Sequence, residues 1–188
     1  MKVVGLCGAS GVGKTTLAER LIRALKARGC RVSVVKHAHK HFDIDRPGKD
    51  SFRHREAGAF EVVVANGRRL ALMREFETEA ELSVHQMLGE LSDLSAFGAE
   101  HWVLVEGFKH ADLPKVEVWR AAHGARPLYP DDPYVVALAC PAGDDLPHPS
   151  GLPRFDLGDE GAAALADFLR QDPGRHEYRF PDEDAPRG

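Results

Sequence analysis

Cysteine is scarce in this sequence, and long apolar runs are missing. The chain has three cysteines, Cys7, Cys30 and Cys140, an odd number with no C-x-x-C pair. This pattern excludes a disulfide framework and a zinc ribbon, and it favours a reducing compartment. No apolar run approaches the length of a membrane span, and the first predicted strand begins at Lys2, which leaves no room for a signal peptide ahead of it. We therefore expect a cytoplasmic protein that does not enter a membrane.

An excess of positive charge is missing as well. The formal net charge is -4, with acidic and basic residues interspersed, which argues against a nucleic-acid-binding protein. The chain has 188 residues, of which 43% are hydrophobic and 29% charged, an ordinary mix for a globular protein. No internal repeat or linker divides it. We expect residues 1–171 to form one domain and the polar residues 172–188 to form a flexible C-terminal tail.

The N-terminal part of the chain alternates between strand and helix patterns. Lys2–Cys7 is a short apolar run typical of a strand buried on both faces. Thr15–Arg28 has apolar residues at helical spacing with charged residues between them, and Gly29 is a natural C-terminal stop. Arg31–Lys36 indicates a second strand. A strand, a glycine-rich loop, a helix and a strand in this order predict a right-handed βαβ unit and a parallel sheet.

The middle of the sequence predicts a β-hairpin. Phe60–Ala65 and Arg68–Arg74 are strand-like runs, and Asn66 and Gly67 lie between them. An Asn-Gly pair between two apolar runs favours a type I′ turn, because both central positions of that turn need positive φ.

The remaining segments predict further helices and strands. Thr78 and Glu81 form a capping box for a helix that continues through Leu94. The other predicted elements are a short helix over Asp50–Ala57, strands at His101–Val105, Val116–Trp119 and Tyr134–Cys140, and a last helix that begins near Asp159.

The glycine-rich loop carries the strongest functional signal. Gly8–Thr15, GASGVGKT, matches the phosphate-binding pattern G-x-x-x-x-G-K-[ST] at every position. Glycines let the backbone turn tightly and bring its N–H groups against phosphate oxygens, and the helix that starts here adds the positive end of its dipole. Lys14 reaches the β and γ phosphates, and the Thr15 hydroxyl coordinates Mg²⁺. The motif predicts a P-loop that binds a Mg-nucleotide.

The motif and its context together predict the fold class. The loop follows a buried strand and opens an amphipathic helix, as the phosphate-binding mechanism requires. We predict an α/β fold of the P-loop NTPase type, with a mixed, mostly parallel sheet flanked by helices and an inserted β-hairpin.

Acidic residues that could complete a metal site follow two of the predicted strands. Glu106 ends the His101–Val105 strand, where a Walker-B-type acid belongs, and ligands of open parallel sheets bind outside the carboxyl ends of the strands. The alternative is an ordinary acid that opens a loop, and we favour the metal-binding interpretation. Asp43 and Asp45 follow Arg31–Lys36, where they are either a Mg²⁺ or water-positioning pair or part of a solvated turn.

Three histidines alternate after the second predicted strand. In an extended segment His37, His39 and His41 would share one face, and imidazoles on one face can bind Zn²⁺ or Ni²⁺. No cysteine flanks them. A polar loop that contacts an anionic ligand is the alternative, and we favour it over a metal site.

Three motifs together resemble a known family. KHAHKHFDIDRPGKDSFRHREAGA over Lys36–Ala59, VEGFK over Val105–Lys109 and PKVEVWR over Pro114–Arg120 are similar to the MobB family of P-loop proteins, which is associated with molybdopterin-guanine dinucleotide biosynthesis. The resemblance covers about the first 140 residues. It implies a protein that binds GTP with Mg²⁺, hydrolyses GTP slowly, and forms a homodimer with a mixed sheet. It also implies a partner, the nucleotidyltransferase MobA, which joins GMP to molybdopterin.

The resemblance also implies site residues. Asp45 and Glu106 match positions for catalysis and, with Thr15, for Mg²⁺. The implied ligand-binding residues are Gly8, Ser10, Gly11, Val12, Gly13, Lys14, Thr15, Thr16, Lys49, Arg53 and Lys109. The family motifs also include Asp50, Ser51, Lys115 and Glu117. Arg and Lys at such positions suit an anionic substrate such as a pterin phosphate.

The sequence departs from the family after Tyr134–Cys140. In the family this strand often runs on to an Asp, and a carboxylate that faces N1 and N2 of guanine selects GTP over ATP. Here Pro141 follows Cys140, and Asp144 and Asp145 come slightly later. We place the guanine-reading position in this region.

Several functions compete with a GTP-binding accessory protein of molybdenum cofactor maturation. A small-molecule P-loop kinase could use Ser51, Arg53 and Arg55 to grip a phosphoacceptor, but no Arg-rich lid follows Glu106. A metal-delivery GTPase could use the histidines but lacks a cysteine pair or a long His tract. A non-catalytic adaptor would bind nucleotide only to set its shape.

Overall fold

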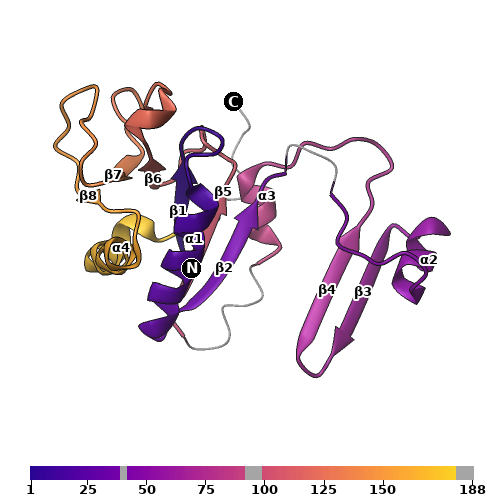
Figure 1. The fold of residues 1–188 in the computed structure, drawn as a ribbon. Coiled ribbons are helices and arrows are strands. Elements are labelled where there is room, and N and C mark those ends of the chain that lie inside the picture. The colour runs from indigo at the N-terminus through magenta and orange to yellow at the C-terminus, as the bar shows by residue number, and fades with distance from the viewer. Residues whose placement is uncertain (39–41, 92–98, 181–188) are drawn as a thin grey trace. The chain divides into compact units, whose positions relative to one another are not determined.

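The computed structural model describes residues 1–38, 42–91 and 99–180, and the chain divides into two compact units (Figure 1). The main unit comprises Met1–His37 and Val84–Gly188, and the small unit comprises Ala38–Ser83.

The main unit is built on a six-stranded sheet with the order β2-β5-β1-β6-β7-β8. The strands are β1 (Lys2–Cys7), β2 (Arg31–Lys36), β5 (His101–Glu106), β6 (Lys115–Val118), β7 (Val135–Ala139) and β8 (Arg154–Phe155). Every neighbouring pair is parallel. The register pairs Leu6 with Glu106 and Cys7 with Glu117, so the carboxyl ends of β1, β5 and β6 meet at one edge. The predicted α/β fold with a mostly parallel sheet is confirmed.

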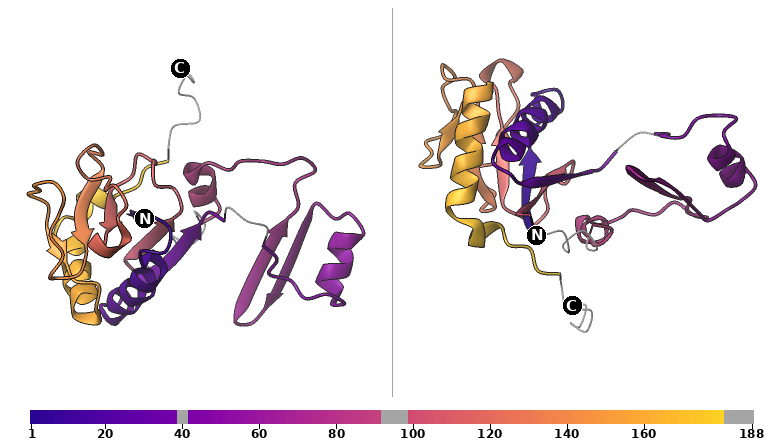
Figure 2. Two further views of the ribbon diagram at one scale, coloured as in Figure 1. Left: turned by 45° about the horizontal axis from the view of Figure 1, so that its top comes forward. Right: turned by 90° about the horizontal axis from the view of Figure 1, so that it is seen from below.

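Helices cover both faces of this sheet. Successive residues of a strand point to opposite faces, and Val3 and Val4 of β1 accordingly belong to two different apolar clusters. The cluster with Val4 includes the buried faces of α1 (Lys14–Ala27) and α4 (Asp159–Gln171), which Figure 2 shows side by side in indigo and yellow. The cluster with Val3 includes α3 (Val84–Gly89). Among the described residues, no helix has the length and apolarity to cross a membrane.

The small unit contains a short helix and the predicted hairpin. Helix α2 (Asp50–Glu56) precedes β3 (Glu61–Asn66) and β4 (Arg69–Arg74), which pair antiparallel as a separate two-stranded sheet. The hairpin is confirmed, but its type I′ turn is wrong. Asn66 pairs with Arg69, so Gly67 and Arg68 are the loop residues, and neither has positive φ. The Asn66 Oδ1 instead accepts the backbone N–H groups of Arg68 and Arg69, each at 2.9 Å.

The predicted capping box does not start a helix. Thr78 and Glu81 are exposed and lie in an irregular segment, and α3 begins only at Val84. A helix in a protein takes most of its stability from a packed apolar face, and the first residues that provide one are the buried Val84 and Leu88. Leu94, the predicted end of this helix, lies outside the described residues.

The C-terminal segment begins with ordered structure where a tail was predicted. Pro173–His176 form a 3-10 helix, and the buried His176 lies with its Nδ1 3.3 Å from the Val3 carbonyl oxygen. An antiparallel bridge joins Lys2 to Glu177. Residues 173–177 are therefore part of the main unit, while residues 181–188 of the predicted tail lie outside the described ranges.

Candidate functional site

The phosphate loop joins the end of β1 to the start of α1. Its glycines Gly8, Gly11 and Gly13 have φ values of 124°, 81° and 108°, which favour glycine because a Cβ would clash with the backbone. A Cβ on Gly8 would also collide with the Val118 carbonyl oxygen. The loop therefore packs directly on the end of β6. The glycines of the motif stand at the positions where the backbone has positive φ.

Lys14 folds over the phosphate loop. Its Nζ donates hydrogen bonds to the carbonyl oxygens of Gly8 at 3.0 Å and Ala9 at 2.7 Å. Partial burial lowers the pKa of Lys14 from its ordinary value, while the nearby charge of Glu106 acts in the opposite direction. The ammonium group thus lies at the loop where the sequence places the phosphates.

The structure brings Thr15 and Glu106 into direct contact. The Thr15 hydroxyl donates to Glu106 Oε1 at 2.8 Å. Glu106 Oε2 lies 3.6 Å from Nζ of Lys36, its register partner on β2. A hydroxyl and a carboxylate are oxygen ligands of the kind that Mg²⁺ takes. The two predicted metal ligands of the main unit therefore lie together beside Lys14, with Lys36 as a neighbour that the sequence analysis did not single out.

The residue after Glu106 fixes the direction of the chain. Gly107 has φ of 104°, and a Cβ there would lie 2.8 Å from the Cβ of His37. The ring of His37 in turn lies against Phe108, with the centroids 5.0 Å apart. His39 and His41 lie outside the described residues. Within the described ranges, no group of three or more His, Cys, Asp or Glu side chains is placed to hold a metal ion.

The loop after β6 adds a residue that the sequence analysis missed. Arg120 Nε donates a hydrogen bond to the carbonyl oxygen of Val12 at 2.9 Å. Arg120 is the last residue of the PKVEVWR motif and follows a strand that ends beside the phosphate loop. A charged residue at the carboxyl end of a parallel strand is the signal that could have found it.

The region predicted to read guanine lies after β7. Asp144 Oδ2 accepts the backbone N–H of Ala121 at 2.7 Å, and the Asp144 carbonyl oxygen accepts from Arg154 Nη2 at 2.7 Å. Asp145 is exposed. Asp144 thus links the loops after β6 and β7, and Asp145 is the more accessible of the two carboxylates.

Lys115 and Glu117 are buried rather than available to a ligand. Lys115 is 1% exposed, and its Nζ donates to the Lys109 and Ala111 carbonyl oxygens and to Asp132 Oδ2 at 2.6 Å. Glu117 is also 1% exposed. The interpretation of Lys115 as a contact for an anionic substrate is wrong, because all its bonds are internal. Lys109, whose side chain is exposed, remains a candidate.

The Glu117 carboxylate accepts hydrogen bonds from the backbone. Its two oxygens accept the N–H groups of Leu128 and Tyr129, both at 2.8 Å. Burial raises the pKa of Glu117, and these two hydrogen bonds act against that rise. Glu117 therefore organises the segment before β7 instead of facing a ligand.

Asp45, Lys49 and Arg53 lie in the small unit. The Asp45 carboxylate accepts from the Ser51 hydroxyl at 2.9 Å and from Arg55 Nη1 at 3.3 Å. Desolvation raises the pKa of Asp45, but the hydrogen bonds from the Arg46 N–H, Ser51 and Arg55 lower it overall. Lys49 and Arg53 are exposed. The Ser51 and Arg55 groups that a kinase would need for its phosphoacceptor are therefore engaged with Asp45.

Arg55 is the centre of the charged network in the small unit. Besides Asp45 it contacts Asp43 at 3.2 Å through Nη1 and Glu75 at 2.6 Å through Nε. Asp43 and Asp45 thus share the Arg55 guanidinium, and these ion pairs hold the loop that carries the two acids.

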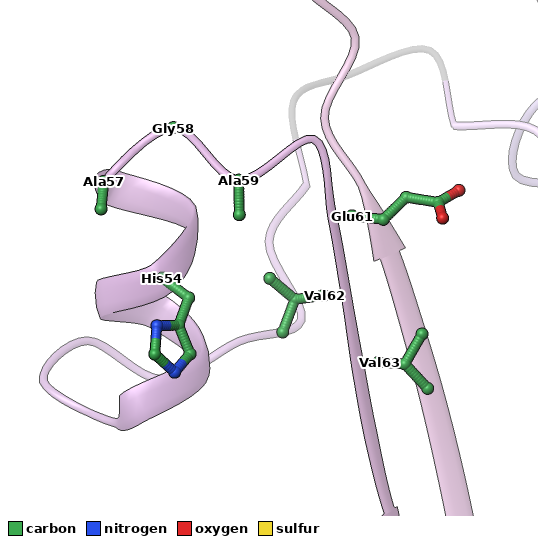
Figure 3. Close-up of a pocket in the computed structure, with 7 residues that line it drawn as sticks. All are labelled: His54, Ala57, Gly58, Ala59, Glu61, Val62 and Val63. Carbon is green, nitrogen blue, oxygen red and sulfur yellow. The ribbon is translucent and has the colours of Figure 1, made fainter.

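An open depression of about 600 Å³ lies beside α2 and β3 in the small unit. Figure 3 shows His54 on the helix and Val62 on the strand among its lining residues, with Gly58 on the connection between them. No residue predicted for the nucleotide site lines it.

The parallel sheet, the glycine-rich loop after β1 and the acid at the end of β5 define a P-loop-type α/β protein. Residues 3–141 match the family described as MobB, Molybdopterin guanine dinucleotide synthesis protein B. The chain belongs to the MobB family.

Two relatives are similar over most of their length. The molybdopterin-guanine dinucleotide biosynthesis adapter protein of Escherichia coli strain K12 is 42% identical over 161 residues, 85% of this chain and 86% of that protein. The adapter protein of the same name from Haemophilus influenzae is 43% identical over 169 residues, 89% of this chain and 86% of that protein.

Solved structures share the fold. The crystal structure of a MobB protein homolog from Bacillus stearothermophilus has a TM-score of 0.66 at 24% identity, covering 91% of this chain and 99% of that one. Bacillus subtilis MobB has a TM-score of 0.61 at 23% identity, covering 95% of this chain and 100% of that one. At this level of identity the likeness establishes the fold alone.

Proposed function

We propose that this chain is a GTP-binding adapter of molybdopterin-guanine dinucleotide biosynthesis that holds Mg-GTP at Gly8–Thr16 and hydrolyses it slowly in the cytoplasm. The adapter role is supported by family membership and by relatives of that name. The nucleotide site is supported chiefly by one observation, the 2.8 Å hydrogen bond between Thr15 and Glu106. It joins the phosphate loop to the acid that a Mg-nucleotide needs.

Each part of the site has a proposed role. Lys14 contacts the β and γ phosphates, and Thr15 and Glu106 hold Mg²⁺, which supplies charge neutralisation for phosphoryl transfer. Glu106 also orients the attacking water. Asp144 and Asp145 lie in the loop that we propose reads guanine. Lys109 is the exposed cation after Glu106 and is a proposed contact for an anionic ligand.

The small unit has a proposed share in the same function. Lys49 and Arg53 are exposed cations suited to an anionic pterin phosphate. Asp45 is proposed as a further catalytic acid, and this role would require its carboxylate to give up its hydrogen bonds to Ser51 and Arg55.

The proposed partners are molybdopterin, a MobA-like nucleotidyltransferase and a second copy of the chain. A homodimer is supported by the hairpin, where Val63, Leu70 and Leu72 are 57%, 68% and 42% exposed. Apolar side chains gathered on one surface are typical of an interaction site. An adapter that brings GTP to a nucleotidyltransferase needs to bind the nucleotide more than to turn it over, which fits slow hydrolysis.

Isothermal titration with nucleotides in Mg²⁺ buffer tests the central claim. GTP is expected to bind at least tenfold more tightly than ATP, about 1.4 kcal/mol. Lys14→Ala is expected to weaken GTP binding more than GMP binding, because the lost charge faces the β and γ phosphates.

The matched control is Lys26→Ala, an exposed lysine in the last turn of α1, which is expected to bind as wild type does. Equal competition by ATP would support a kinase or a promiscuous nucleotide-binding protein instead. Equal losses of GTP and GMP affinity in Lys14→Ala would contradict the assigned phosphate contact, and absence of any nucleotide binding would refute the function.

A further inference from the structure

The segment after β6 lies along the phosphate loop. Gly8 touches the Val118 carbonyl so closely that a Cβ would not fit. A Cβ on Gly13 would be 3.6 Å from Arg120 Nη2, and a Cβ on Gly11 would be 3.6 Å from His123 Nε2. The two segments therefore run close together from the first glycine of the loop to the last.

A side-chain hydrogen bond also joins the segment after β6 to the phosphate loop. Arg120 Nε donates to the carbonyl oxygen of Val12 at 2.9 Å, and Val12 itself is 2% exposed. Val12 lies in the middle of the turn whose N–H groups are expected to face the phosphates. A guanidinium is planar and always charged, so a bond through Nε also sets the plane of the whole group beside Gly13.

The backbone around Arg120 is held on both sides. The preceding Trp119 donates its N–H to Ala139 on β7 at 3.0 Å, and its indole Nε1 donates to the Ala125 carbonyl at 3.1 Å. The following Ala121 donates its N–H to Asp144 Oδ2 at 2.7 Å. Arg120 therefore projects from a fixed segment, and its bond to Val12 transmits that fixed position to the phosphate loop.

We propose that Arg120 is a positioning residue that sets nucleotide affinity by holding the Val12 carbonyl and, through it, the phosphate-binding N–H groups. This inference rests on the proposed nucleotide binding. Lys14 is proposed to touch the phosphates directly and thus to discriminate among nucleotides by phosphate number. Arg120 acts on the loop that every phosphorylated nucleotide uses, so GDP and GTP depend on it equally.

Dissociation of fluorescent GDP and GTP analogues in stopped flow separates these roles. Arg120→Met keeps a long apolar stem but removes the donor, and it is expected to speed dissociation of both analogues by the same factor, about tenfold. Arg120→Lys retains a cationic donor that can reach a carbonyl oxygen, and it is expected to recover part of the affinity. Arg126→Met is the control, because the Arg126 side chain is 80% exposed and pairs with Asp131 away from the phosphate loop, and its rates are expected to match wild type.

Thermal melting without nucleotide separates positioning from stability. Arg120→Met is expected to melt close to wild type.

A dissociation rate for Arg120→Met equal to that of Arg126→Met would overturn the inference while leaving nucleotide binding intact. A loss confined to GTP would also overturn it, because Arg120 would then contact the γ phosphate. Should Arg120→Met fail to fold, Arg120→Lys carries the test: faster dissociation of both analogues by one common factor would support the inference, and wild-type rates for both would overturn it. Failure of the wild-type chain to bind either analogue would refute the proposed function and this inference together.

Discussion

Both the backbone and the side-chain partners of Glu106 hold its carboxylate in one position. It ends β5 at the carboxyl edge of the sheet, and Gly107 lets the chain turn closely past His37. Thr15 and Lys36 then hold its two oxygens. A carboxylate aligned in this way has little freedom left to lose when a metal binds, which favours a role in orienting Mg²⁺ or water.

Glu106→Gln is expected to separate catalysis from binding. In phosphoryl transfer the protein mainly positions groups and stabilises charge, so removing the acid costs rate more than affinity. We expect GTP affinity within a few-fold of wild type and hydrolysis lowered by at least about tenfold, or 1.4 kcal/mol of barrier. Single-turnover hydrolysis at high protein concentration measures the rate, and titration measures the affinity.

Glu19→Gln, an exposed change on α1, is the control and is expected to leave both quantities unchanged. Hydrolysis by Glu106→Gln at the wild-type rate would make Glu106 a structural loop residue and direct attention to Asp43 and Asp45. An affinity that falls as much as the rate would show that the contact of Glu106 with the metal contributes equally to ground-state binding, contrary to the expected separation of rate from affinity.

The sequence predicts some contacts at the edge of the sheet better than others. Thr15 and Glu106 are found from a motif and from the rule that parallel strands end at one edge. Lys36 and Arg120 are not, because their contacts depend on which strands are neighbours. Lys36 meets Glu106 since β2 lies beside β5, and Arg120 meets Val12 since β6 lies beside β1. Chain order does not give that strand order.

Among the elements, β6 has an unusual core residue. Lys115 is buried, and its aliphatic stem crosses β1 at Gly5, where a Cβ would be only 2.7 Å from the Lys115 Cγ. Its ammonium group joins the loop after β5, at Lys109 and Ala111, to Asp132 before β7. Lys115 thus connects the segment after β5, the start of β6 and the segment before β7.

Lys115→Met is expected to destabilise the fold. Breaking a buried pair from one side leaves the Asp132 charge and two carbonyl oxygens without their donor, which costs about 3 kcal/mol. Urea unfolding is the measurement, with an unchanged m-value as the sign that the change is one of stability.

The exposed Lys26→Met is the stability control and is expected to stay within about 0.5 kcal/mol of wild type. Adding Asp132→Asn to Lys115→Met removes the unpaired charge and is expected to recover part of the loss. A loss below about 1 kcal/mol for Lys115→Met would show that the pair contributes little.

Two element-level predictions failed for local reasons. The capping-box pattern at Thr78 and Glu81 has no buried apolar face directly after it, and α3 starts at Val84, where one begins. The hairpin formed from its two apolar runs, but the register placed Asn66 in β3, and the Asn66 side chain accepts the hydrogen bonds of the turn. Apolar runs predicted that these elements exist, whereas the start of α3 depended on its packed face and the hairpin turn depended on the Asn66 hydrogen bonds.

At the scale of the whole molecule, one face of the hairpin is apolar and uncovered within the small unit. The register places Val63 opposite Leu72 and Ala65 opposite Leu70, and residues two apart on a strand share a face. The Glu61–Arg74 ion pair lies at one end of this face. The arrangement supports the proposed homodimer, since an exposed two-stranded hairpin is at most marginally stable in water.

Leu70→Lys is expected to weaken the homodimer. Burying a leucine contributes roughly 1.5–3 kcal/mol, and a lysine in its place also brings a charge into the interface. The dimer dissociation constant, from sedimentation equilibrium, is expected to rise by at least about tenfold.

Thr78→Lys adds the same charge at an exposed position of the small unit outside the hairpin and is expected to leave association unchanged. A wild-type chain that sediments as a monomer would refute the homodimer. A dimer that tolerates Leu70→Lys would place the interface elsewhere.

Because its three native cysteines are buried, the molecule is suited to labelling at a cysteine introduced on its surface. All are free thiols and all are buried. Burial, reinforced by the charge of Glu117, raises the pKa of Cys7 to about 12, and burial followed by the charge of Glu100 raises the pKa of Cys30. Because thiol reagents react with an accessible thiolate, a cysteine introduced on the surface will be the preferred point of attachment. Dyes or spin labels can therefore be placed one at a time on an otherwise unaltered chain.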